Sequence, residues 1–112
     1  MSDVTVYEKR TCTTCRQVAE LLRSRGIDYD DVQYHVEGIG AERIRELLSM
    51  AGISARDALR MREDGAAELA ESPEDEIVAA MAARPELLQR PIVVHGDRAV
   101  LARPPEKVLD LF

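Results

Sequence analysis

Two cysteines, Cys12 and Cys15, stand three residues apart near the start of the chain, which has 112 residues and no other cysteine. Redox-active thiol pairs and metal sites both use this spacing. Cys12 lies where an expected strand ends and an expected helix begins, so unpaired amides and the helix dipole would favour its thiolate. Cys15 follows one helical turn later on the same face, within reach of a disulfide. The pair predicts thiol exchange, with Cys12 as nucleophile and Cys15 as the candidate resolving thiol.

Arg10 and Arg16 flank the pair, and their positive charges would also favour a thiolate. Zinc is an alternative use of the pair, but tetrahedral zinc needs four ligands and the chain has no second cysteine pair. His35 and His95 could complete such a site only by a coincidence of folding, and we expect both in loops. We therefore expect no metal. Either cysteine could instead be an inert buried residue, the second more readily than the first.

The composition describes a single domain over residues 1–112, long enough to bury a core without disulfides or a structural metal. The net charge of −6 argues against direct nucleic-acid binding, which relies on positive charge. No apolar run approaches the roughly 20 residues that cross a bilayer, and the start lacks a signal-peptide pattern. We expect a cytoplasmic protein without membrane contact, and a monomer, because no long apolar stripe is left over.

The periodicity of apolar residues predicts the order β-α-β-α, a helical insertion, and then β-β-α. Such an order suits a mixed four-stranded sheet with flanking helices, an α/β layout of the thioredoxin-like kind. The expected elements are a strand over 4–7, a helix over 12–25, a strand over 32–34, a loop over 35–40, a helix over 41–50, a helical turn over 56–61, a helix that starts at 72–75 and ends before Pro85, a hairpin with strands 91–94 and 99–101, and a helix over 105–111.

Further motifs resemble those of the glutaredoxin-coupled arsenate reductases and their Spx-type relatives. Besides the strand-cysteine-helix start, they are Gly52-Ile53-Ser54 with Leu59-Arg60, the run from Pro85 to Val94, and Arg103-Pro104. The resemblance spans essentially the whole chain. It implies that the substrate is arsenate or a similar oxyanion. With arsenate, Cys12 would attack the arsenic atom and form a thiol-arsenate adduct. It also implies that Arg60, Arg90 and Arg103 bind the anion, as a thiolate meeting an anion requires. The bond before Pro91 would be cis and face the cysteine.

Three positions depart from those arsenate reductases. Glu8 stands where they carry a histidine, and Lys9-Arg10 stands where the family pattern is asparagine-proline. A glutamate near Cys12 would raise the pKa of the thiol. Cys15 replaces a serine, as in the Spx-type branch, and this second cysteine would permit an internal Cys12–Cys15 disulfide.

The resemblance implies an enzyme, a thiol-dependent reductase of the arsenate reductase type with no bound cofactor. Its electrons would come from an external thiol system: glutathione with glutaredoxin, thioredoxin, or a mycothiol-type system. One alternative is an Spx-type redox-sensing regulator that binds RNA polymerase. Another is a general thiol-disulfide oxidoreductase. The three candidate arginines favour the reductase, because they would have no evident role in a general oxidoreductase.

Overall fold

In the computed structural model, which describes residues 3–112, four strands form one mixed sheet in the order β2-β1-β3-β4. The first strand, β1 (Val4–Tyr7), pairs in parallel with β2 (Asp30–Val32) and antiparallel with β3 (Ile92–His95). The last strand, β4 (Arg98–Leu101), pairs antiparallel with β3 as a hairpin. This arrangement confirms the predicted mixed four-stranded sheet.

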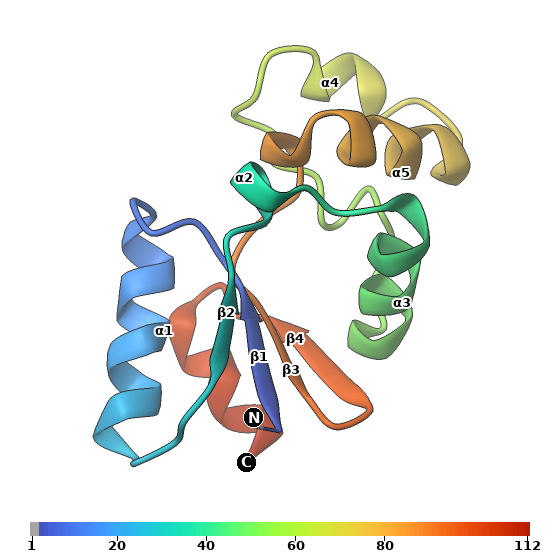
Figure 1. The fold of residues 1–112 in the computed structure, drawn as a ribbon. Coiled ribbons are helices and arrows are strands. Elements are labelled where there is room, and N and C mark those ends of the chain that lie inside the picture. The colour runs from blue at the N-terminus through green and yellow to red at the C-terminus, as the bar shows by residue number, and fades with distance from the viewer. Residues whose placement is uncertain (1–2) are drawn as a thin grey trace.

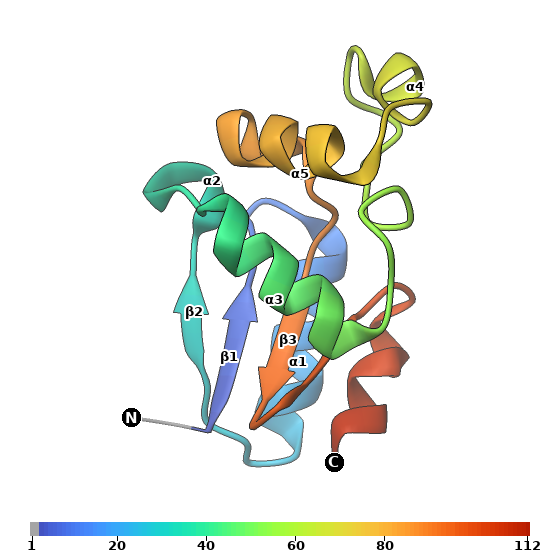
Figure 2. The same ribbon diagram turned by 90° about the vertical axis from the view of Figure 1, so that its right-hand side faces the viewer.

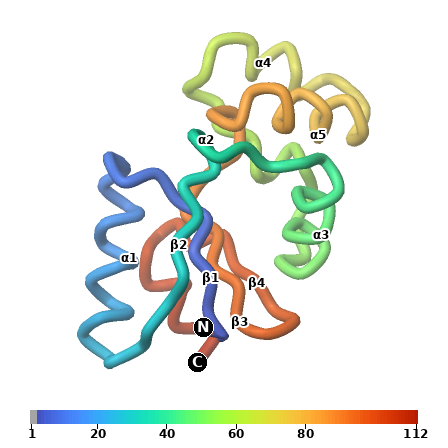
Figure 3. Tube along the Cα trace, in the orientation of Figure 1, coloured from blue at the N-terminus to red at the C-terminus, as the bar shows by residue number. Residues whose placement is uncertain are grey.

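Helices cover both faces of the sheet. The helix α1 and the terminal 3-10 helix η2 lie on one face, and α3 lies on the other (Figures 1 and 2). The remaining helices gather beyond one end of the sheet, as the chain trace also shows (Figure 3). None of the helices in the described part of the chain is both long and apolar enough to cross a membrane. The bounds are α1 Thr13–Ser24, α2 Tyr34–Glu37, α3 Ala41–Ala51, α4 Ala66–Leu69, α5 Glu74–Ala83, η1 Pro85–Leu87 and η2 Pro105–Leu111.

Successive side chains along each strand point to opposite faces of the sheet, so the core has two layers. Val6 and its cross-strand partner Val93 pack on the side of α1 and η2, where Leu22 is fully buried with them. Their neighbours along the strands, Tyr7 and Ile92, face the opposite layer with α3 and α5. The sheet is thus buried on both faces, which fixes its register.

The second strand lies two residues earlier than predicted, because Tyr34 belongs to a helix. Its side chain is fully buried, and its hydroxyl donates a hydrogen bond to the carbonyl of Leu88. This long-range contact places the short helix α2 where the sequence predicted the strand's end and a loop. The strand itself contains Asp30 and Asp31, both exposed at the sheet edge, so the usual apolar signal of a strand is missing.

Candidate active site

Three segments meet at one end of the sheet and carry the candidate site. The register pairs Tyr7 at the end of β1 with Ile92 at the start of β3, and Ile92 with Leu101 at the end of β4. The antiparallel pairing therefore brings together the residues that follow β1, precede β3 and follow β4. These residues include Cys12, Arg90, Pro91 and Arg103.

Cys12 is the N-cap residue of α1. Its amide donates a 2.9 Å hydrogen bond to the carbonyl of Lys9, which closes the turn between strand and helix. Its Sγ accepts a hydrogen bond of 3.4 Å from the amide of Cys15, one of the helix amides without an intrahelical partner. Cys12 is partly exposed, whereas Cys15 is fully buried. Solvent-borne reactants can therefore reach the first sulfur and not the second.

The environment drives the pKa values of the two thiols apart. Burial raises the pKa of Cys12, but hydrogen bonds with Cys15 and the positive charges of Arg90 and Arg103 together lower it by a larger amount. The pKa of Cys12 is therefore below its ordinary value. Burial is also the largest influence on Cys15, and it raises the pKa of that thiol to about 12. Cys12 is thus the thiol suited to nucleophilic attack at neutral pH, and Cys15 is held protonated.

Arg90 is a buried cation, only 4% exposed. Its Nη1 lies 3.4 Å from the carbonyl oxygen of Glu86 and 3.8 Å from the carboxylate oxygen Oε2 of the same residue. Burial lowers the pKa of Arg90, but Tyr34, Glu86 and Cys12 raise it by more, so the guanidinium stays charged. Its Nε is buried without a hydrogen-bond partner among residues 3–112. An anion beside Cys12 could satisfy this donor.

Arg103 is fixed against Arg90. Its Nη1 donates a 2.9 Å hydrogen bond to the backbone carbonyl of Arg90. Both arginines directly precede cis peptide bonds, Arg90–Pro91 and Arg103–Pro104, and only the first of these was predicted from the sequence. The positive charges of both arginines lower the pKa of Cys12.

Arg60 approaches the same region from the helical insertion. Its amide donates a 2.7 Å hydrogen bond to the carbonyl of Leu87, and the neighbouring Leu59 forms a β-bridge with Leu88. The segment of Arg60 is thereby tied to the segment that ends in Arg90. Its Nε lies 3.6 Å from Glu63 Oε2 and has no hydrogen-bond partner in the described part of the chain. The positive charges that most lower the pKa of Cys12 are those of Arg90 and Arg103, rather than that of Arg60.

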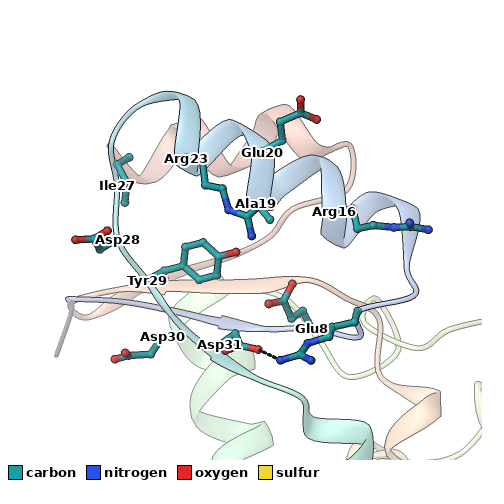
Figure 4. A pocket seen from close by; sticks show the side chains of 11 residues that line it. Glu8, Arg16, Ala19, Glu20, Arg23, Ile27, Asp28, Tyr29, Asp30 and Asp31 are labelled. Carbon is teal, nitrogen blue, oxygen red and sulfur yellow. Dashed lines mark ion pairs between the residues drawn. The ribbon is translucent and has the colours of Figure 1, made fainter.

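The charges that most lower the pKa of Cys12 are those of Arg90 and Arg103, rather than those of the sequence neighbours Arg10 and Arg16. The Arg10 side chain is 80% exposed, and its Nη2 lies 3.9 Å from Asp31 Oδ2. Both Arg10 and Arg16 line a hollow beside α1. Figure 4 shows Arg16 there. Arg10 lies in the loop after β1 and Arg16 on the solvent-facing side of α1, and both residues are exposed.

Lys9 and Glu86 form a polar contact that the sequence did not reveal. Lys9 Nζ donates to Glu86 Oε2 at 3.2 Å, across 77 positions of sequence. Burial raises the pKa of Glu86, but Lys9 and then Arg90 lower it by more, so the carboxylate stays charged. This ion pair joins the turn before Cys12 to the helix before Arg90, and no local pattern in the sequence could have indicated it.

The two histidines belong to regular elements rather than to the expected loops. His95 ends β3, where its Nδ1 is 2.9 Å from the carbonyl oxygen of Leu111 and its ring stacks on Phe112 at 4.7 Å. His35 belongs to α2, rather than to the expected loop. Within residues 3–112, no group of three or more histidine, cysteine, aspartate or glutamate side chains is arranged to hold a metal ion.

Comparison with known proteins identifies the family. The model of the ArsC family matches residues 7–111. The chain belongs to the ArsC family. It is 36% identical over 113 residues to the uncharacterized Escherichia coli protein YfgD, covering 96% of this chain and 95% of that protein. It is 32% identical over 116 residues to an arsenate reductase of Escherichia coli, covering 100% of this chain and 82% of that enzyme.

Solved structures of ArsC-family members have the same fold. The arsenate reductase from Vibrio cholerae superposes with a TM-score of 0.91 at 32% identity, covering 97% of each chain. The thioredoxin-like fold and the resemblance to arsenate reductases are thereby confirmed.

Proposed function

We propose that this ArsC-family protein is a thiol-dependent arsenate reductase in which Cys12 is the nucleophile. The observation that carries the proposal is the position of Cys12 Sγ at the N-terminus of α1, with Arg90 and Arg103 lowering its pKa. A preorganised positive centre of this kind stabilises an oxyanion and the charge that develops on it during attack. Relatives named arsenate reductase, similar over the whole chain, support the choice of arsenate.

In the first step, the Cys12 thiolate attacks arsenic and an S–As bond forms. One arsenate oxygen takes up protons from solvent and leaves as water. The adduct keeps its negative charge, and the free Nε of Arg90 offers it a buried donor. Arg103 holds the Arg90 backbone and adds a second charge. We assign Arg60 as a third anion-binding group, which would move from Glu63 to the substrate when arsenate binds.

In the second step, another thiolate attacks Cys12 Sγ. The S–As bond breaks, its electron pair leaves with arsenic, and As(V) becomes As(III) while two thiols become a disulfide. Cys15 is the internal candidate for this thiol, since its amide already contacts the Cys12 sulfur. Thioredoxin, glutathione with glutaredoxin, or a mycothiol-type system would then reduce the disulfide.

Coupled turnover tests the proposal. Purified protein is given arsenate and NADPH with either the thioredoxin system or the glutathione-glutaredoxin system. We expect arsenate-dependent NADPH consumption with at least one of them, and its complete loss in Cys12→Ser. The Cys15→Ser variant should lose turnover with thioredoxin and keep any turnover that glutathione alone supports. Absence of arsenate-dependent consumption with both systems would overturn the assignment.

A further inference from the structure

Cys15 cannot attack another sulfur while its thiol keeps its proton. The side chain is fully buried, and burial raises its pKa to about 12. Thiol-disulfide exchange proceeds through the thiolate. If Cys15 resolves an adduct on Cys12, the protein must therefore supply a proton acceptor close to a thiol that bulk solvent does not reach.

Glu8 is a mostly buried residue that lines the hollow beside α1. It follows β1 directly, and its amide donates a 3.0 Å hydrogen bond to the carbonyl of Val32. The residue is only 6% exposed. Within residues 3–112, its carboxylate forms no hydrogen bond and no ion pair. Its oxygens do not belong to the side-chain atoms that are buried without a partner in the described part of the chain, so they reach the solvent of the hollow.

The Glu8 side chain lies between the sheet and α1, on the side where Cys15 is buried. It lines a hollow of about 1070 Å³, together with Ala19 and Arg23 of α1. Figure 4 shows its carboxylate directed toward that helix. Cys15 lies one helical turn before Ala19 on the same face. The negative charge of Glu8 also acts on the Cys15 thiol. Glu8 thus lies beside the helix that carries the buried thiol, and it lines a hollow that is open to solvent.

We propose that Glu8 accepts the proton of Cys15 when Cys15 attacks the sulfur of Cys12. In the arsenate reaction, which rests on the proposed function, the Cys15 proton moves to the Glu8 carboxylate as the new S–S bond forms. The S–As bond breaks and its electron pair leaves with arsenic. Glu8 then returns its proton to solvent through the hollow.

The groups that surround Glu8 leave it able to gain and lose a proton at neutral pH. Burial, followed by the charge of Asp31 on β2, raises its pKa to about 7. Arg10 and Arg23 lower it by a smaller amount, and Glu8 in turn raises the pKa of Tyr29. A general base works best with a pKa near the working pH. The other charged residues of the hollow are Arg16, Glu20, Asp28 and Asp30.

The Glu8→Gln variant separates this role from a purely electrostatic one, because the two roles predict opposite changes in the rate at which Cys15 attacks Cys12. The Glu8 charge raises the pKa of Cys15, so its removal alone would make the Cys15 thiolate easier to form and would speed resolution. Removal of a proton acceptor would instead slow resolution.

The experiment follows two thiol steps without arsenate. Reduced protein is mixed with excess dithionitrobenzoate, an aromatic disulfide. Cys12 attacks it and releases one thionitrobenzoate. Cys15 then attacks the mixed disulfide on Cys12, the Cys12–Cys15 disulfide forms, and a second thionitrobenzoate leaves. The second phase is intramolecular, so its rate is independent of reagent concentration, and Cys15→Ser should abolish it.

We expect the second phase of the native protein to accelerate as the pH rises through about 7, where Glu8 loses its proton. At pH 8, Glu8→Gln should slow this phase by about 10-fold or more and remove the inflection, and Glu8→Asp should restore part of the rate. The rate of the first phase in Glu8→Gln should stay within about twofold of the native rate, as expected if Cys12 and the fold are intact. Glu20→Gln, the same change at an exposed position of the hollow, should alter neither phase.

An unchanged or faster second phase in Glu8→Gln would overturn the inference. So would a native second phase without an inflection near neutral pH, a measurement that needs no variant. Because arsenate is absent from this assay, a failure of arsenate turnover with a normal second phase would count against the proposed function alone.

Discussion

Arg103 offers the clearest single-residue test of the anion site. The Arg103→Gln change should reduce kcat/KM for arsenate by about 10- to 1000-fold, because it removes a fixed donor and a charge that lowers the pKa of Cys12. Steady-state kinetics across arsenate concentrations measure the loss. Arg98→Gln is the matched control. Arg98 is an exposed residue of the hairpin strand β4, and its side chain donates a hydrogen bond to the carbonyl of Asp110 in η2. An equal loss in both variants would contradict the assignment.

At the residue scale, the sequence located the cysteine pair and misjudged its electrostatics. The pairing of Cys12 with Cys15 is local, so one helical turn was enough to predict that they meet. The charges that act on them are not local. Arg90 and Arg103 were named only through the resemblance, and the ion pair of Lys9 with Glu86 joins residues that are 77 positions apart.

At the element scale, α1 holds Cys12 in place through its buried face. Leu22 is fully buried against the sheet and η2, whereas the adjacent Leu21 is only partly buried. Leu22→Ala should lower the free energy of unfolding by about 2–5 kcal/mol, with a clearly smaller loss for Leu21→Ala. Urea denaturation followed by circular dichroism measures both. Equal losses would mean that the two faces of α1 are not distinguished as described.

Elements with a strong periodic pattern were predicted close to their observed bounds. The helix Ala41–Ala51 and the hairpin strands Ile92–His95 and Arg98–Leu101 follow from apolar spacing and turn residues. The edge strand Asp30–Val32 and the helix Tyr34–Glu37 do not, because a partner strand and a contact at Leu88 define them. Tertiary contacts decide such short segments, and a local window of sequence does not contain them.

At the scale of the whole molecule, Glu8 should make stability depend on pH. Its pKa is raised from 4.5 to about 7 in the folded state, so the folded state binds the proton more tightly than the unfolded chain. The stability that this group provides is present below pH 4.5 and is lost as the pH rises through 7. Native protein should therefore lose on the order of 2 to 3 kcal/mol relative to Glu8→Gln between pH 4.5 and pH 8.

Urea midpoints of the two proteins across that range test the pH dependence. The Glu8→Gln variant should be the more stable protein at pH 8, and the difference should shrink toward pH 4.5. A difference that stays constant across the range would contradict a raised pKa for Glu8. The Glu20→Gln variant serves as the control with the same change in charge at an exposed position.

The overall architecture was accessible from the sequence, because one β-α-β unit and one hairpin leave few ways to build a four-stranded sheet. The active site depends on that architecture: register alone brings the ends of β1 and β4 and the start of β3 together. The helical insertion was less accessible. Its connection to the site runs through Arg60 and Leu87, and short turns over residues 52–70 carry little periodicity.

The pKa of the Cys12 thiol tests the central claim most directly. The rate at which iodoacetamide alkylates Cys12, followed by mass spectrometry across pH, reports the thiolate fraction. The account predicts an inflection below the ordinary value for a cysteine, and an upward shift of that inflection in Arg103→Gln. An inflection at or above the ordinary value, unmoved by the loss of Arg103, would contradict it.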